Sequence, residues 1–238
     1  MVEHPIDCTV CGAALSYLGQ TEPMVCSLCG DAIPSGVRCL QGHFVCDACH
    51  SGTAKDAIQR LYSTTALKDP IRIALEAMRH PRVKMHGPEH HFLVSAALVA
   101  AWYNARGEPE RKAAQVAEAR RRSDPVAGGF CGIQGACGAG VGVGTFVSIV
   151  TGATPLTARE RGLANQATAQ ALTAIAGAAG PRCCKRDSWL ALLAGARFAR
   201  ELLGTGLSAH GPACEFQELN RECLSDGCPF FRRDAAAG

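Results

Sequence analysis

The chain has 238 residues, of which 47% are hydrophobic and 19% charged, a composition that supports packed domains and argues against general disorder. The net charge of +3 is too small to indicate binding to nucleic acid or to an anionic membrane. There are 14 cysteines, and the opening stretch MVEHPIDCTV has no apolar core of the kind found in signal peptides. We therefore expect a cytoplasmic protein whose cysteines bind metal rather than form disulfides.

The pattern along the chain predicts a mainly α fold: an Ala/Gly-rich helical domain preceded by a small zinc-finger module. We expect a zinc-binding module over residues 1–52, a helical domain over 53–205 and a cysteine-containing tail over 206–238. Proline and glycine breakers separate the helical segments. The predicted helices are Ala54–Thr64, Pro70–Arg79, His90–Ala105, Pro109–Arg122, Ala136–Thr151, Ala158–Ala178 and Cys184–Leu203.

Seven cysteines and one histidine of the first 52 residues come in closely spaced pairs. In three of the pairs two residues separate the cysteines, and this spacing lets both thiolates face one ion. Eight ligands fill two tetrahedral zinc sites with none left over. The predicted ligands are Cys8, Cys11, Cys26, Cys29, Cys39, His43, Cys46 and Cys49.

Two pairings of these ligands are open. Sequential pairing joins the first two pairs on one zinc, and it leaves the other zinc with four ligands from only eleven residues, 39–49. Interleaved pairing joins the first pair with Cys39 and His43, and the second pair with the last; we favour it. This arrangement resembles cross-brace and treble-clef zinc fingers, and CLQGHFVCDAC resembles the middle of a RING-type finger, although the order of pairs differs. Such a module has two possible roles. It either binds a protein or a nucleic acid, or it only stabilises a small subdomain.

Histidines gather at the start of the third predicted helix, in HGPEHHFLV. There His86, Glu89 and His90 can converge on a substrate or a metal, or can move protons near neutral pH. The alternative is an ordinary helix start, with Glu89 at the positive end of the helix. We predict His86 and His90 as acid/base residues.

The stretch GGFCGIQGACGAGVGVG spans residues 128–144. A dinucleotide loop needs an apolar strand before it and an acidic residue after it, and a Walker-type loop needs Gly-Lys-Ser/Thr; the sequence has none of these. The many glycines also argue against a membrane span in the uncharged run 125–158. We predict instead a loop carrying Cys131 and a buried helix that begins near Cys137 and packs closely on Ala158–Ala178. The helix N-terminus should lower the pKa of the Cys137 thiol.

Two cysteine groups follow. Cys183 and Cys184, in GPRCCKRDSW, precede the last long helix, where Asp187 and the neighbouring cations can bind a carboxylate or transfer a proton. The tail then adds three cysteines, the last of which is followed by proline, as in iron–sulfur sites. These cysteines either share one cluster with the glycine-rich segment, bind a metal of their own, or are buried thiols. The tail cysteines are Cys214, Cys223 and Cys228.

Four stretches together carry a resemblance to one family. HGPEHHFLV, the glycine run with its continuation to TGATPL, GPRCCKRD, and CEFQELNRECL with CPFF resemble an uncharacterised, cysteine-rich domain-of-unknown-function family of bacteria and archaea. The resemblance covers nearly the whole chain. Some members of that family carry the label of SAM-dependent methyltransferase, which the residues of the glycine run do not support.

A weaker resemblance connects the chain to iron–sulfur serine dehydratases and cysteine desulfidases. Those enzymes have a Gly-x-Ala-Cys-like element opening a small-residue helix and a Pro-Cys-x-x-Arg-Asn-like element opening a later one, to which 135–137 and 181–187 are similar. The resemblance implies a [4Fe–4S] cluster on Cys137 and Cys183, with Cys131 or a tail cysteine as third ligand. This chain has an extra residue after Pro181 and lacks a counterpart of the middle cysteine of those enzymes.

Our leading interpretation is an enzyme that uses an iron–sulfur or zinc thiolate site in elimination or sulfur transfer on a small molecule. The alternatives are a non-enzymatic zinc-binding adaptor, with a protein partner on the zinc module, and a SAM-dependent methyltransferase. The predicted acid/base residues are His86, His90 and Asp187. The predicted cofactor ligands are Cys131, Cys137, Cys183, Cys184, Cys214, Cys223 and Cys228.

Overall fold

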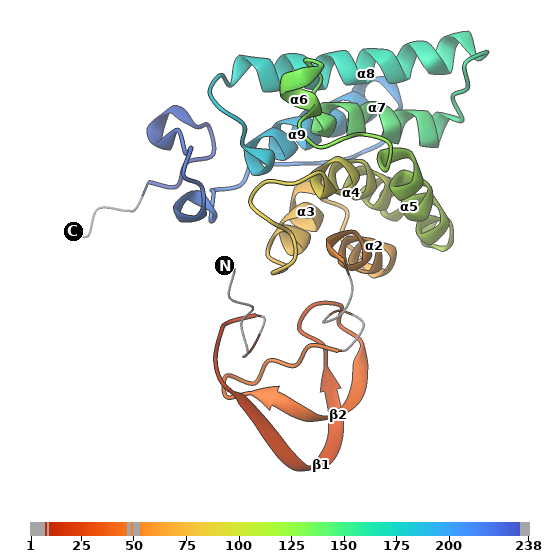
Figure 1. Cartoon of the computed structure of the whole chain (residues 1–238). Helices are drawn as coiled ribbons and strands as arrows, with labels where there is room; N and C mark the ends of the chain where they lie inside the picture. The colour runs from red at the N-terminus through yellow and green to blue at the C-terminus, as the bar shows by residue number, and fades with distance from the viewer. Residues whose placement is uncertain (1–7, 9, 47–48, 50–52, 234–238) are drawn as a thin grey trace.

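The computed structural model describes residues 8, 10–46, 49 and 53–233 (Figure 1). An N-terminal module, described at residue 8, over 10–46 and at 49, contains strands β1 (Leu15–Val25) and β2 (Ala32–Cys39). A helical part follows, and after it a tail over residues 206–233 with little regular structure. The predicted fold class, mainly α with a small cysteine-rich module in front, is confirmed.

The two strands form an antiparallel hairpin. Leu15 lies opposite Cys39 and Val25 lies opposite Ala32, with an irregularity in the register between Tyr17 and Glu22. The pairing brings the chain before β1 beside the chain after β2. The first cysteine pair therefore meets the end of β2, while the second pair forms the turn of the hairpin.

The helices agree closely with the predicted ones. The end residues differ by at most two positions, which is the usual uncertainty of helix boundaries. The sequence did not predict α6 (Phe130–Ile133), a single turn, nor the short 3₁₀ turns η1 (Gln217–Leu219) and η2 (Ser225–Gly227) of the tail. The other helices are α2 (Ala54–Thr64), α3 (Pro70–Met78), α4 (Glu89–Arg106), α5 (Pro109–Ser123), α7 (Gly138–Thr151), α8 (Ala158–Gly177) and α9 (Cys184–Leu202).

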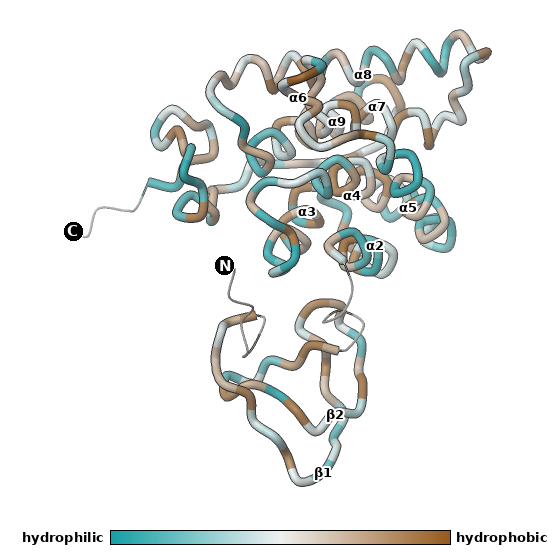
Figure 2. The backbone as a smooth tube through the Cα atoms, viewed as in Figure 1, coloured by the Kyte–Doolittle hydropathy of each residue, from teal (hydrophilic) through white to brown (hydrophobic). Residues whose placement is uncertain are grey.

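Helix α4 is the centre of the helical part. Every residue from 92 to 101 is 0% exposed, so this helix has no solvent face. It is packed against α2, α3, α5, α7 and α9. Figure 2 shows apolar residues, in brown, gathered around α3, α4 and α7, and polar residues, in teal, on the outer turns of α5. None of the helices in the described ranges is both long and apolar enough to cross a membrane.

The glycines of α7 allow close contact with two neighbouring helices. A Cβ atom on Gly142 would lie 2.9 Å from the carbonyl oxygen of His91 in α4. A Cβ atom on Gly144 would lie 3.0 Å from the carbonyl oxygen of Ala164 in α8. The predicted packing of the glycine-rich helix against the Ala-rich helix is therefore confirmed.

The tail folds back onto the beginning of α9, beside which it lies in Figure 1. The fully buried ring of Trp189 meets Phe230 edge-on, with 5.3 Å between ring centroids, and lies 6.1 Å from Phe216. The N–H of Cys214 donates to the carbonyl oxygen of Phe230 at 2.6 Å, which closes the tail into a loop. This packing brings the tail cysteines to the cysteines that precede α9.

Candidate metal centres and the cavities beside α9

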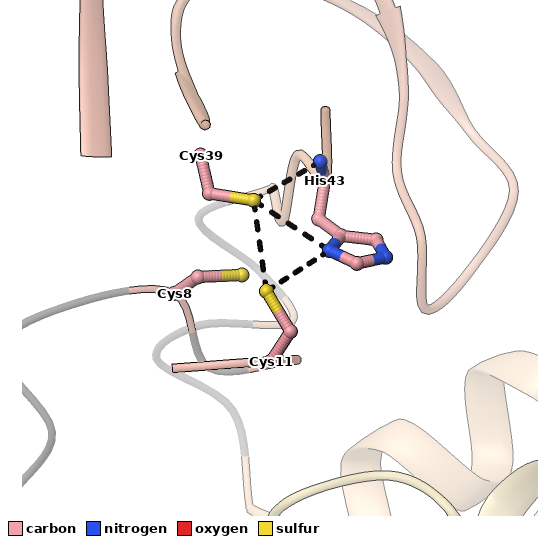
Figure 3. Close-up of side chains that lie close together, drawn as sticks. All are labelled: Cys8, Cys11, Cys39 and His43. Carbon is pink, nitrogen blue, oxygen red and sulfur yellow. Dashed lines mark hydrogen bonds between the residues drawn. The ribbon is translucent and has the colours of Figure 1, made fainter. Parts of the chain in front are cut away.

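The first cysteine group lies at the open end of the hairpin, where β1 begins and β2 ends. Side chains of Cys8, Cys11, Cys39 and His43 point toward one another, and their ligand atoms all lie within 4.8 Å (Figure 3). The Sγ atoms of Cys11 and Cys39 are 3.8 Å apart, and Nδ1 of His43 lies 3.3 Å from Cys11 Sγ. Four ligands placed tetrahedrally at zinc–sulfur bond length would be about 3.8 Å apart. The group therefore has the spacing that one metal ion requires.

The second group lies at the hairpin turn and consists of Cys26, Cys29, Cys46 and Cys49, all of them buried. The Sγ atoms of Cys29 and Cys46 are 3.8 Å apart. The module thus has the interleaved pairing, and the hairpin explains why. Its turn places the second pair beside the last, while the strand pairing places the first pair beside the end of β2.

Local turns set the position of each sulfur. The backbone φ angles of Gly12 and Gly30 are +72° and +77°, a conformation that favours glycine and tightens the turn after each cysteine pair. Within these turns a backbone N–H points at the first sulfur, as from Val10 to Cys8 Sγ at 3.4 Å. The sequence therefore specifies each two-cysteine turn locally.

Thiols this close cannot all ionise without a cation. Burial raises the pKa of the Cys29 thiol to about 12. Burial also acts to raise the pKa of Cys26, but the backbone N–H groups of Cys46, Cys29 and Leu28 outweigh it and lower that pKa to about 7. A divalent ion would stabilise the thiolates together. Both groups are thus compatible with metal binding.

The seven remaining cysteines lie around the beginning of α9, and six of them divide between two cavities. Cys131 and Cys137 line one cavity, of about 620 Å³. The other is small and largely enclosed, and Cys183 faces it together with all three tail cysteines, Cys214, Cys223 and Cys228. Cys183 is thus grouped with the tail rather than with the glycine-rich segment. Burial raises the pKa of the seventh thiol, that of Cys184, to about 11.

The cysteine turns at the four-cysteine cavity repeat a feature of the N-terminal cysteine turns. The N–H of Phe216 donates to Cys214 Sγ and the N–H of Ser225 donates to Cys223 Sγ, each at 3.4 Å and each from two residues further on. The N–H of Arg186 donates to Cys183 Sγ at 3.5 Å. The spacing differs, however. Across the described residues, only the two N-terminal groups bring three or more such ligands within 4.8 Å of one another.

Two buried donors without a hydrogen-bond partner in the described residues lie at or near this four-cysteine cavity. Trp189 lines it, and within the described residues its buried Nε1 has no hydrogen-bond partner. The same holds for the buried Nζ of Lys185, which lies 4.9 Å from the ring centroid of Phe216. Burial raises the pKa of the Cys183 and Cys214 thiols. These two thiols therefore stay protonated until a cation binds. Without a thiolate nearby, Nε1 of Trp189 and Nζ of Lys185 have no anion in the described part of the chain to which they can donate.

The 620 Å³ cavity has a polar wall formed by Arg182, Arg186 and Asp187. Nε of Arg186 donates to Asp187 Oδ1 at 3.0 Å, and Nη2 donates to the carbonyl oxygen of Pro181 at 3.0 Å. Cys137 is the N-cap residue of α7. Our expectation of a lowered pKa there is wrong, because burial outweighs the N–H groups of Ala139 and Gly140 and raises the pKa of Cys137. Arg182 was not among the predicted site residues, although it lies within the GPRCCKRD motif.

The histidine cluster does not converge on one point. Nε2 of His86 lies 3.2 Å from Asn220 Oδ1, toward the tail. His90 is 1% exposed, and its Nδ1 donates to the carbonyl oxygen of Gly87 at 3.1 Å. Glu89 accepts a hydrogen bond from the backbone N–H of Lys84 at 3.0 Å. The acid/base roles of His86, His90 and Asp187 stay predictions.

Comparison with known proteins gives a family without an assigned activity. No curated protein matches the chain, and no solved structure matches it. The two resemblances to enzymes therefore stay predictions. One family model covers residues 58–231, which is most of the chain and includes the tail cysteines and all of the helical part except the first turn of α2. The chain belongs to this family, which is described as a family of unknown function (DUF5714).

Proposed function

We propose that Cys183, Cys214, Cys223 and Cys228 hold an iron–sulfur cluster, and that the two N-terminal groups each hold a zinc ion. The observation that carries this proposal is the convergence of four thiols on one enclosed cavity. They come from the residue before α9 and from three separate places in the tail, so only the folded tail brings them together.

The spacing of these thiols favours a cluster over a single ion. The N-terminal sulfurs stand 3.8 Å apart, as around one zinc, whereas the four thiols beside α9 do not gather within 4.8 Å. A four-iron cluster is several ångströms across and keeps its four thiolates correspondingly far apart. Its negative charge also suits the unpaired Nε1 of Trp189 and the nearby Lys185 cation. The Cys228–Pro229 pair is frequent at iron–sulfur sites.

We propose further that the protein is an enzyme acting on a small molecule in the 620 Å³ cavity. Arg186 lines both cavities and so connects the metal centre with the substrate site. A cluster with four cysteine ligands supplies electron or sulfur chemistry and leaves no open iron, so sulfur transfer fits better than elimination. Asp187, at the cavity wall, is the acid/base candidate. A reducing cytoplasmic location belongs to the same proposal.

Metal and sulfide analysis of anaerobically purified full-length protein tests the metal centres. We expect about four iron and four sulfide per chain with brown colour, and about two zinc. Cys214→Ser and Cys228→Ser should lose the iron and the colour but retain zinc. Cys131→Ser is the matched control and should retain the iron, the brown colour and the zinc.

Two results would contradict the proposal. Zinc without acid-labile sulfide would remove the cluster and favour the non-enzymatic zinc-binding alternative. Equal loss of iron from Cys131→Ser and Cys228→Ser would show that the cluster is not confined to the four-cysteine cavity.

A further inference from the structure

The 620 Å³ cavity lies between the α6–α7 turn, the C-terminal turns of α8 and the beginning of α9. Its volume is in the range of small-molecule sites. The wall formed by α8 is largely apolar, with a leucine, an isoleucine and alanines. Three glycines, two of them beside the thiols, expose backbone to the cavity. These lining residues are Leu172, Ile175, Ala176, Ala179, Gly132, Gly135 and Gly180.

The charges in the lining are not balanced. Asp187 is paired with Arg186, which is 4% exposed. Nη1 of Arg186 donates no hydrogen bond to any residue that the structure describes. Arg182 is exposed and makes no ion pair with any described residue. The cavity therefore has one arginine charge more than its single carboxylate neutralises.

Two long helices add to this positive potential. The 14-residue α7 begins directly after Cys137, and the 19-residue α9 begins directly after Cys183, two residues beyond Arg182. The first turn of a helix carries partial positive charge on its free N–H groups. Arg182, Arg186 and Cys137 thus line one cavity, and the two helix starts lie beside these lining residues.

We propose that this cavity binds a small carboxylate with a short apolar chain and places it against the Cys137 thiol. The arginines would hold the carboxylate, since a guanidinium matches its geometry, and the α8 wall would cover the chain. Only the statement that this carboxylate is a substrate rests on the proposed function. Binding of the anion needs no metal.

The charge of a thiol reagent tests the proposal directly. Iodoacetate and iodoacetamide both react when a cysteine sulfur bonds to the methylene carbon and iodide leaves, but only iodoacetate is a carboxylate. The rate ratio of iodoacetate to iodoacetamide at Cys137, measured by peptide mass spectrometry, is compared with the ratio in the urea-unfolded chain. We expect folding to raise this ratio about tenfold. Propionate should slow labelling of Cys137 by iodoacetamide.

Arginine variants locate the effect. Arg182→Ala should lower the ratio toward that of the unfolded chain, and Arg182→Lys should retain most of it. Arg197→Ala is the matched control, because Arg197 is exposed on α9, outside the cavity lining, and its loss changes the net charge equally. Each variant should retain the iron content of the wild-type protein, so loss of the cluster and loss of anion preference are scored separately.

Three results would overturn the inference. The first is a ratio that folding does not change. The second is an equal effect of Arg182→Ala and Arg197→Ala, which would assign the preference to net charge. The third is a Cys137 thiol that reacts with neither reagent, because that thiol would then not be open to the cavity.

Discussion

Individual sulfur atoms in both halves of the chain sit in the same kind of turn. Cys8, Cys214 and Cys223 each accept a hydrogen bond from the backbone N–H two residues further on, at 3.4 Å. The tail cysteines are therefore positioned by their local backbone in the way that metal-binding cysteines are.

His80 gives a pH-dependent prediction at the same scale. It is 2% exposed, and its Nδ1 accepts the backbone N–H of Arg82 at 3.1 Å. Burial, with a smaller effect of the Arg82 charge, lowers its pKa from 6.5 to about 4. Between these values the unfolded chain binds the proton and the folded chain does not. His80 therefore contributes stability that is complete above pH 6.5 and is lost as the pH falls toward 4.

His80→Asn should remove this dependence, because an amide oxygen can accept the same N–H and does not titrate. Between pH 6.5 and 4, wild-type protein should lose up to about 1.4 kcal/mol per pH unit more than the variant. Urea unfolding of both proteins at pH 7 and pH 5 measures the difference. Identical pH dependence would mean that folding does not lower the pKa of His80.

At the scale of elements, helix α7 depends on having no side chain where it crosses its neighbours. Gly142 faces the backbone of α4, at the His91 carbonyl and the Ser95 N–H, and backbone atoms cannot move aside as a side chain can. Because α4 is buried on all sides, a shift of α7 would also disturb the packing of α4 against the other helices.

Two glycine-to-alanine variants separate this packing from helix propensity. Gly142→Ala should destabilise the protein by about 1–3 kcal/mol, because its Cβ would overlap the His91 carbonyl oxygen. Gly162→Ala, on the exposed side of α8 with no atom within 4 Å of the added Cβ, should stabilise it by about 0.5–1 kcal/mol. Thermal unfolding of both variants checks the opposite signs. Equal effects would mean that the crossing with α4 adjusts freely.

The elements that were predictable are those with local signals. Helix α2 was predicted to the residue from its helical pattern and the breakers around it, and the structure adds a capping box between Thr53 and Asp56. The strands of the hairpin were not predicted individually, because metal ligands rather than apolar alternation organise that segment. The partners of Cys183 were not predictable either, because 30 or more residues separate it from the tail cysteines. Their meeting depends on the packing of Trp189 with Phe216 and Phe230, which no local pattern encodes.

At the scale of the molecule, two separate apolar clusters account for two units. One contains only residues of the helical part and the tail. The other is small and is built around the second cysteine group, with Met24 and Phe44 beside its thiols. An ion pair between Arg60 and Asp31 links the two units at 2.9 Å, but both side chains are more than one third exposed. Such a pair contributes about 0–1 kcal/mol, so this ion pair couples the two units only weakly.

Removal of one metal ligand should therefore unfold the N-terminal module alone. Cys46→Ser breaks the second group, and with it the core of the module, because few apolar residues remain there without the ion. We expect less zinc and rapid proteolysis between residues 10 and 46. Both tryptophans, Trp102 and Trp189, lie in the helical part, so their fluorescence and its urea midpoint should not change. Arg60→Ala, the control, should retain zinc and protease resistance. If Cys46→Ser instead lowered the urea midpoint of the tryptophan signal, the helical part would need the module to fold, and the predicted boundary near residue 52 would not separate two domains.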